Sequence, residues 1–368
     1  MLVGLSSLLF IMYAIFIIPV MIARVLAGLS YGIVYITLIV HGCEVAVPKH
    51  RGFVITMIHF CLFVGVLISS STLHQVYSIL SYDYNPNTVI GILGIIFTIQ
   101  AVILQLVVSR ESPIYLLQHG HEQEALDVMV RLRSESQESW TIRNEFDETK
   151  RMLFEDAQST SNIFGGKNLK SLLIVLLLKV SFVASFNMPL NLIWLENTEI
   201  KFYDGVIDTS GIYLSTIRML LIAASVYYVD GRKKKLMITS TSVSGLILIV
   251  VAIFYNRIDD FFGSPALITM TFLFQFFAGT GIGLIGDIYS SEAFNTTKKP
   301  LSIAFTSTIE FLLQIFLIAM HFYMDEYNFE FLAVSCFIML LISGIVTYYL
   351  PDTSNTSLRE ARNLFRAL

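Results

Sequence analysis

Five ionisable side chains lie inside long apolar stretches of this 368-residue sequence: His59, Lys179, Arg218, Asp287 and Glu310. An ionisable group in such a setting is costly, and it usually faces a cavity or a partner of opposite charge. One interpretation is a solute pathway, in which Arg218 and His59 meet an anionic solute. Another is a buried pair such as Arg218–Asp287. A further alternative for Lys179 is that its long side chain extends to the membrane surface and places its charge there.

Two amides, Asn187 and Asn191, flank Pro189 in one of these stretches. They either bind a solute or satisfy the backbone groups that the proline leaves free. Together with the charged positions, this pattern gives the substrate-contacting residues that we expect. They are His59, Asn187, Arg218 and Asp287.

Composition places these residues in a membrane protein. The chain is 55% hydrophobic and only 14% charged, whereas a soluble domain carries about 25% charged residues. The cysteines Cys43, Cys61 and Cys336 lie in or beside apolar stretches as small buried hydrophobic residues, and no CxxC pair occurs. We therefore expect neither a metal site nor a disulfide framework.

A helix that crosses a bilayer needs roughly 20 mostly apolar residues. The sequence contains ten candidates, which predict an all-α polytopic membrane protein. They are 1–18, 20–43, 52–73, 88–109, 169–191, 208–229, 235–255, 265–288, 301–322 and 330–350. The first lacks a basic region and a small-residue cleavage site, which favours a span over a cleaved signal peptide.

Basic residues gather in every second connection, at 44–51, 110–168, 230–235 and 292–299, and in the tail. The other connections hold only Lys201 and Arg257 among basic residues, and they carry the acids Asp83, Glu196, Glu199, Asp204, Asp208, Asp259, Asp260, Asp325, Glu326 and Glu330. Because positive loops remain inside, we expect the 110–168 linker, the C-terminus and Met1 to be cytoplasmic.

The 110–168 segment predicts two or three small amphipathic helices. Ser112-Pro113 is a good helix start and Gly120 a helix end. Ile142, Phe146, Thr149 and Leu153 recur at helical spacing. In the tail, Ser357 and Glu360 form a capping-box pattern, which predicts a short helix through Phe365.

An internal repeat organises the chain. Glu44 and Glu292 each end an apolar stretch and precede basic residues, and Glu111 and Asp352 follow two stretches later. We therefore predict a half-bundle of four spans (1–109), a cytoplasmic linker (110–168), a half-bundle of six spans (169–350) and a cytoplasmic tail (351–368). Compared with the second half, the first lacks two helices, so that ten of twelve spans are expected.

Several motifs carry a family resemblance: A-R-V-L-A-G-L-S-Y-G (23–32), E-V-A-V-P-K-H-R-G (44–52), R-E-S-P-I-Y-L-L (110–117), D-G-R-K-K-K (230–235) and P-D-T-S-N-T-S-L-R-E (351–360). In this order they resemble the sugar porter family of the major facilitator superfamily, in particular its insect trehalose and glucose facilitators. The resemblance implies facilitative transport of a hexose or trehalose across the plasma membrane by alternating access.

The resemblance also implies a charge network at the cytoplasmic helix ends that holds an inner gate closed. Its residues here would be Glu44, Arg51 and Glu111 in the first half and Asp230, Arg232, Glu292, Lys299 and Asp352 in the second. The alternative is a solvated loop face, in which such pairs contribute little.

At the positions where the family places sugar-binding amides and a tryptophan, this sequence has His59, Phe182–Phe186, Arg218 and Asp287. An organic-anion or other non-sugar carrier, or a truncated relative that does not transport, is therefore the alternative function. No GxxxxGK[ST] loop, HExxH or GxSxG motif occurs, so we expect no enzyme and no cofactor. The expected partners are a small solute and the lipid bilayer, without nucleic acid.

Overall fold

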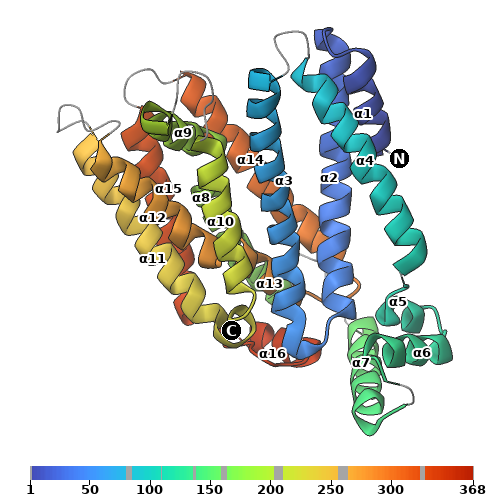
Figure 1. Ribbon diagram of the computed structural model, residues 1–368. Coiled ribbons are helices and arrows are strands. Elements are labelled where there is room, and N and C mark those ends of the chain that lie inside the picture. The colour runs from blue at the N-terminus through green and yellow to red at the C-terminus, as the bar shows by residue number, and fades with distance from the viewer. Residues whose placement is uncertain are drawn as a thin grey trace.

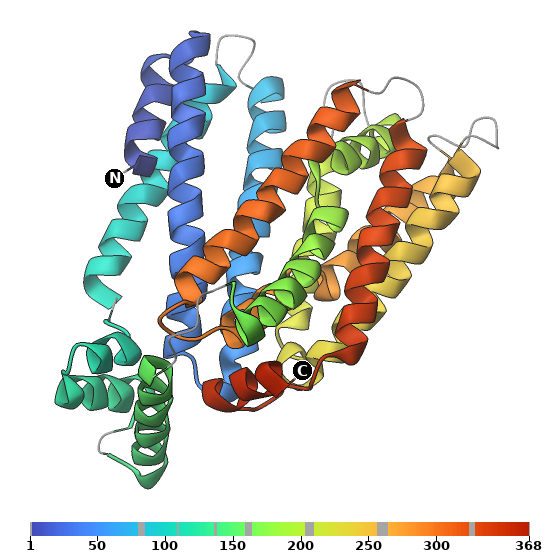
Figure 2. The ribbon, with the colours of Figure 1, turned by 180° about the vertical axis from the view of Figure 1, so that it is seen from behind.

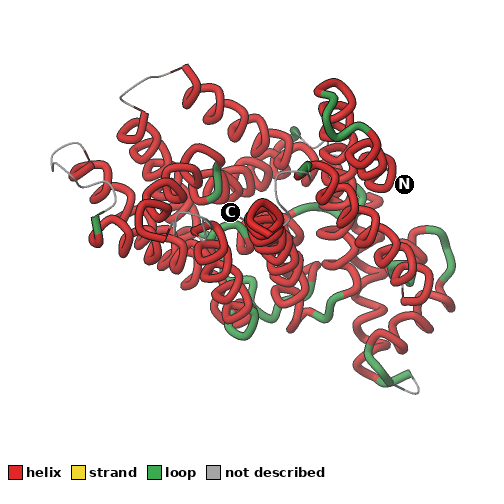
Figure 3. Tube along the Cα trace, turned by 45° about the horizontal axis from the view of Figure 1, so that its top comes forward, coloured by secondary structure: helices red, strands yellow, loops and turns green. Residues whose placement is uncertain are grey.

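The computed structural model describes residues 2–79, 85–108, 110–135, 138–158, 164–202, 210–255, 264–323 and 328–367. Arg257 and the predicted loop acids Asp83, Asp204, Asp208, Asp259, Asp260, Asp325 and Glu326 lie outside these residues. Two helical bundles stand side by side, with a group of short helices at one end (Figures 1 and 2). Every regular element in the described part of the chain is helical (Figure 3), which confirms the predicted all-α class.

The first bundle consists of α1 (Leu2–Met12), α2 (Ile17–Val45), α3 (Arg51–Ile79) and α4 (Pro86–Val108), with a 3₁₀ turn η1 (Pro48–His50) before α3. The predicted span 1–18 is wrong in its length, because α1 ends at Met12 and α2 already starts at Ile17. Pro19 lies in the first turn of α2 rather than between the helices. Its missing N–H costs nothing there, because the first N–H groups of a helix have no intrahelical acceptor.

The second bundle contains eight helices. They are α8 (Gly166–Ser185), α9 (Met188–Phe202), α10 (Ser210–Ser225), α11 (Val229–Tyr255), α12 (Pro265–Gly281), α13 (Leu284–Ala293), α14 (Lys299–Tyr323) and α15 (Asn328–Tyr349). Two predicted spans, 169–191 and 265–288, are each broken into two helices, α8–α9 and α12–α13. Eight of the described segments are long and apolar enough to cross a membrane, and α1 and α10 are shorter apolar helices.

The short helices α5 (Pro113–Gln118), α6 (Glu122–Leu132), α7 (Trp140–Gln158) and α16 (Leu358–Ala367) lie at one end of the molecule, here called the linker end (Figure 1). Ser112 accepts hydrogen bonds from the backbone N–H groups of Ile114 and Tyr115, and Gly120 has a φ of +80°. The Ser357 and Glu360 side chains each accept from the other's backbone N–H. The predicted helix starts and stop are thus confirmed.

Apolar contacts hold the bundles together near the linker end. One core combines Ile39 and Ile55 of the first bundle with Leu284 and Ile288 of the second, and a separate core lies inside the second bundle around Trp194. Toward the opposite end, α14 separates from α2 (Figure 2). The outer faces expose large apolar side chains, such as Leu106 and Val107 of α4, as expected of lipid-facing helices.

Close packing of α1 on α4 depends on Gly91. A Cβ atom at this position would lie 2.7 Å from the backbone oxygen of Ser7 and from a side-chain carbon of Ile11. We therefore expect Gly91→Ala to lower the stability of the purified protein by about 1–3 kcal/mol, because overpacking must push the two backbones apart. The thermal unfolding midpoint measures this effect. Gly65→Ala is the matched control, since nothing lies within 4 Å of its Cβ position, and an equal midpoint for both variants would contradict the account.

A buried charge cluster between two broken helices

The two helix breaks meet in the middle of the second bundle. Between α8 and α9, Phe186 leaves the helical conformation (φ −142°, ψ 62°). Between α12 and α13, Gly283 has a φ of +90°, and a Cβ atom on it would lie 2.4 Å from the ring of Phe182. Glycine is needed there both for its backbone conformation and for this close approach. Broken helices inside a membrane bundle supply free backbone groups and are typical of solute and ion sites.

Asn187 stabilises the first break. Its side-chain oxygen accepts a hydrogen bond from the backbone N–H of Leu190, and its amide nitrogen donates to the backbone oxygen of Val183. The amide therefore links the end of α8 to the start of α9. Of the two sequence interpretations of Asn187, this geometry agrees with the satisfaction of backbone groups beside Pro189.

Lys179 of α8 is the centre of a buried charge cluster. It is 2% exposed, and its Nζ lies 2.8 Å from Asp287 Oδ1 and 3.2 Å from Glu310 Oε2. It also donates to Ser307 Oγ at 3.0 Å and to the Tyr35 hydroxyl at 3.2 Å. Of the interpretations of Lys179, the alternative that it reaches the membrane surface is wrong, because both acids pair with it inside the bundle.

Asp287 joins the cluster to the first bundle. Its Oδ2 accepts a hydrogen bond from the hydroxyl of Tyr35 on α2 at 2.5 Å and lies 2.7 Å from His59 Nε2 on α3. Asp287 itself stands in the first turn of α13, where the helix dipole favours a negative charge. One carboxylate thus connects α2 and α3 of one bundle with α8 and α13 of the other.

Arg218 of α10 does not join this cluster, so the alternative of a buried Arg218–Asp287 pair is wrong. Its Nη1 donates to the backbone oxygen of Ser185 at 2.9 Å and to Gln275 Oε1 at 3.1 Å, and its Nη2 donates to Ser185 Oγ at 3.0 Å. Its guanidinium carbon lies 4.9 Å from the ring centroid of Phe63 and 5.1 Å from that of Phe186.

Aromatic rings lie next to both charged groups. The ring of Phe182 lies 5.8 Å from His59 and 5.6 Å from Phe186, and Phe186 lies 5.0 Å from Phe63. His59 and Asp287, two of the predicted substrate contacts, contact each other. Arg218, the third, instead packs on Phe63 and Phe186.

A second group of charges lies at the linker end. Glu292 of α13 is fully buried and accepts from Arg51 Nη1 at 3.0 Å, Lys233 Nζ at 2.8 Å and Thr353 Oγ1 at 2.7 Å. Asp230 accepts from the backbone N–H groups of Gly52 and Phe53, and these contacts also join the bundles. The ion pair between Arg51 and Glu292 brings together two predicted gate residues that are far apart in the sequence.

The other predicted gate residues make different contacts. Glu44 accepts from the Ser112 hydroxyl, Asp352 from Ser354 in its own turn, and Lys299 lies 3.5 Å from Cys43 Sγ. Glu111 and Arg232 are exposed, and no ion pair is found for either among the described residues.

The kink at Arg232 (φ −143°, ψ 27°) exposes this residue and turns Lys233 inward. Sequence reasoning missed Lys233, because one member of a run of four basic residues cannot be distinguished without this kink. It also missed Tyr35, which has no sequence signal beyond a hydroxyl on an apolar helix.

The tail docks on the linker helices through further pairs. Arg362 contacts Asp156 and Glu155, and Arg359 contacts Glu155. The hydrogen bond from Arg359 lowers the pKa of Glu155 below its ordinary value. Asp156 also accepts from the backbone N–H of Thr296 at 3.0 Å, so that α7, the tail and the α13–α14 connection are held together.

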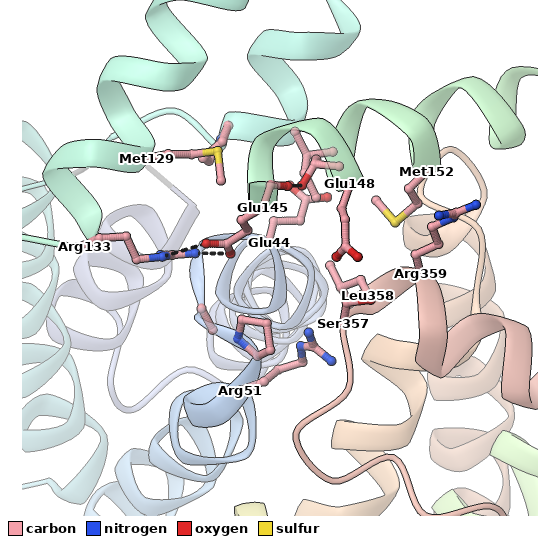
Figure 4. Close-up of a pocket in the computed structure, with 15 residues that line it drawn as sticks. Glu44, Arg51, Met129, Arg133, Glu145, Glu148, Met152, Ser357, Leu358 and Arg359 are labelled. Atoms are coloured by element: carbon pink, nitrogen blue, oxygen red, sulfur yellow. Dashed lines mark hydrogen bonds and ion pairs between the residues drawn. The ribbon is translucent and has the colours of Figure 1, made fainter. Parts of the chain in front are cut away.

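A small cavity of about 60 Å³ lies where α2, the linker helices and the tail meet (Figure 4). Arg133 pairs with Glu145 at its edge, and Glu148 of α7 points toward the start of the tail helix near Ser357 and Leu358. Most of its lining side chains belong to the linker and the tail. The cavity therefore belongs to the docking of the tail, away from the buried cluster.

Comparisons with known proteins agree with this architecture. A family model described as "Sugar (and other) transporter" matches residues 3–365. Probable polyol transporter 3 of Arabidopsis thaliana is 22% identical over 305 residues, which cover 74% of this chain and 58% of that protein. Membrane transporter D1 of Leishmania donovani is 26% identical over 293 residues, which cover 75% of this chain and 50% of that protein. The chain thus spans about half the length of these curated relatives.

Solved structures of the xylose transporter XylE share the fold. The proton:xylose symporter bound to 6-bromo-6-deoxy-D-glucose matches 99% of this chain and 82% of its own, with a TM-score of 0.75 and 13% identity. A double tryptophan mutant gives a TM-score of 0.81 and 15% identity over the same shares. A partially occluded inward open conformation from E. coli gives 0.64 and 13% identity over 95% and 80%.

The structural matches confirm the predicted major facilitator fold. The family model covers nearly the whole chain, in agreement with the motifs found in the sequence and with the expectation of a transporter-type chain rather than an enzyme. The protein is an integral membrane protein that belongs to the sugar (and other) transporter family.

Proposed function

We propose that this protein carries a sugar of the hexose or trehalose class across a membrane by alternating access, with the solute bound between the two bundles. The observation that carries the proposal is the pair of polar layers between the bundles: the Arg51–Glu292 contact at the linker end and the Tyr35–Asp287–His59 contacts deeper inside. Alternating access needs such localised contacts, because a two-state equilibrium shifts only through interactions that differ between its states.

We further propose that the linker end is cytoplasmic and that the membrane is the plasma membrane. Basic residues of α6, α7 and α16 all lie at this end (Figure 1), and excess Lys and Arg mark the cytoplasmic side. The proposed functional units are the half-bundle 1–109, the linker 110–168, the half-bundle 169–350 and the tail 351–368.

Within this scheme Glu292 is the centre of the inner gate. Arg51 supplies a cation from the first bundle, and Lys233 and Thr353 supply donors from the second. If Arg51 moves away, Glu292 keeps Lys233, a cation of its own bundle, as an ion-pair partner. This arrangement supports a gate that opens at a moderate cost, since complete removal of a buried partner costs about 3–5 kcal/mol.

The same reasoning applies to the buried cluster. Lys179, Glu310 and Asp287 stay together within the second bundle, whereas Tyr35 and His59 would withdraw with the first. We propose that these two side chains form a deeper latch, because their withdrawal leaves Asp287 still paired with Lys179 inside the second bundle.

Cys43 reports on the inner gate. It is buried on α2, where its Sγ contacts the backbone oxygen of Ser291 at 3.2 Å. Glu292→Gln should weaken the Arg51 contact and raise the rate at which a fluorescent maleimide labels Cys43 several-fold. All variants carry Cys61→Ser and Cys336→Ser, so that the maleimide reports on Cys43. The replacement of Cys61 is needed because this residue is exposed, contrary to expectation. The control is Glu111→Gln, which should leave the rate unchanged; equal rates in both variants would refute the gate.

Removal of the cluster's cation should be strongly destabilising. Lys179→Met leaves Asp287 and Glu310 buried together without their shared lysine, and we expect a loss of about 3–5 kcal/mol, measured from the thermal midpoint. A second change, Glu310→Gln, should recover part of this loss. Lys298→Met, at an exposed lysine, is the control. A Lys179→Met variant as stable as the wild type would show that the cluster does not hold the charges as a unit.

Transport itself is tested with the purified chain in liposomes. We expect uptake of radiolabelled D-glucose or trehalose that saturates with concentration and exceeds uptake by protein-free liposomes, because a carrier has a finite number of sites. If both sugars enter only at the protein-free rate, facilitative transport of this sugar class by this chain is refuted, and the non-transporting or non-sugar alternatives remain.

A further inference from the structure

Arg218 is a buried cation with only neutral partners. It is 2% exposed, and its three hydrogen bonds go to the backbone oxygen and hydroxyl of Ser185 and to the amide oxygen of Gln275. Its Nε has no acceptor. No carboxylate in the described part of the chain forms an ion pair with it, although Lys179, Arg51 and Lys233 all have acidic partners.

Such an arrangement is costly when the site is empty. A guanidinium stays protonated in proteins, and a buried charge without a counter-charge is among the most destabilising features of a fold. The rings of Phe63 and Phe186 provide attraction through their faces, but they carry no net charge. Within the described part of the chain, the positive charge of Arg218 is therefore left without a counter-charge, and it shares this property with Lys299 at the linker end, which contacts Cys43 Sγ.

The free donors of Arg218 have a defined chemistry. A guanidinium has five N–H groups, and three of them take part in the bonds described above. One donor on Nε and one on Nη2 remain. These two nitrogens form the side of a guanidinium that a carboxylate accepts with its two oxygens.

Arg218 lies at a helix break where the two bundles meet. Ser185 and Phe186 belong to the break between α8 and α9, Gln275 belongs to α12, and Phe63 comes from α3 of the other bundle. The site thus lies beside a broken helix and is contacted by both bundles. Asp287 pairs with Lys179 and His59 instead, so that this carboxylate is not its counter-ion.

We propose that Arg218 binds a carboxylate of the solute, and that the site takes a sugar acid of the hexose class in preference to the neutral sugar. The carboxylate supplies the missing negative charge, and the sugar ring packs against the phenylalanine rings. Movement of the bound sugar acid rests on the proposed transport function, whereas its binding at Arg218 does not.

The binding test uses the thermal midpoint of the purified full chain. Sodium D-glucuronate is the probe, D-glucose the neutral analogue, and sodium chloride at equal ionic strength the salt control. We expect glucuronate to raise the midpoint of the wild type by about 2 °C or more, because a ligand that binds only the folded state stabilises it. Glucose should raise it less, and chloride should have no effect.

The variants assign the effect to Arg218. Arg218→Gln should abolish the shift caused by glucuronate, while Arg218→Lys, which keeps the charge, should retain part of it. Arg151→Gln, at an exposed arginine of α7, is the matched control and should retain all of it. Without ligand, Arg218→Gln should unfold at or above the wild-type temperature, because it removes an uncompensated charge.

Three results would overturn the proposal: a glucuronate shift that persists in Arg218→Gln, a glucuronate shift no larger than that of glucose, or a ligand-free Arg218→Gln variant that unfolds well below the wild type. The last result would show that Arg218 is a structural residue.

Uptake into liposomes separates this inference from the proposed function. Glucose uptake without glucuronate binding would refute only the inference, and Arg218-dependent glucuronate binding without any uptake would refute only transport.

Discussion

The bilayer removes water from the flanks of these helices, so each buried charge must find its partner within the chain. This constraint accounts for the arrangement of the polar residues. Lys179 is surrounded by two carboxylates and two hydroxyls, and Glu292 by two cations and a hydroxyl. Either group would be strongly destabilising if it were buried without partners, and residues from several helices supply those partners. Arg218 differs from these groups, because its three hydrogen-bond acceptors are all neutral.

Satisfying these charges requires that the helices be interrupted. A continuous helix presents its backbone groups only to itself, whereas the breaks at Phe186 and Gly283 free backbone carbonyls and allow close approach. The oxygen of Ser185 becomes an acceptor for Arg218, and the new start of α13 places Asp287 in a first turn. Asn187 satisfies backbone groups on both sides of the first interruption, and Gly283 adopts the positive φ that the second requires.

The two polar layers between the bundles differ in which partners remain beside the buried acids when the bundles separate. At the linker end, Arg51 contributes a full charge from the first bundle, but Lys233 remains with Glu292. In the interior, the first bundle contributes only Tyr35 and His59, while Lys179 stays with both acids. In both layers each acid keeps a cation in its own bundle. The contacts across the interface can therefore break without leaving an unpaired carboxylate inside the protein.

The sequence alone determined the membrane class, the approximate position of the apolar stretches, the linker and tail helices with their caps, and the family. These features depend on local composition, on helical spacing and on caps such as Ser112 and Ser357, which act over a few residues. It also identified the charged positions His59, Lys179, Arg218, Asp287 and Glu310 as unusual, because a charge in an apolar run is visible without a structure.

Only the tertiary structure decided how these charges pair. Arg51 with Glu292 and Tyr35 with Asp287 join residues more than 200 positions apart, and such pairs depend on the rotation of each helix about its own axis. The kink at Arg232 selects Lys233 from four adjacent basic residues, and the break after α8 supplies the Ser185 oxygen with which Arg218 bonds in place of Asp287. These choices follow from long-range packing and from the demand that buried charges be neutralised, which no local pattern encodes.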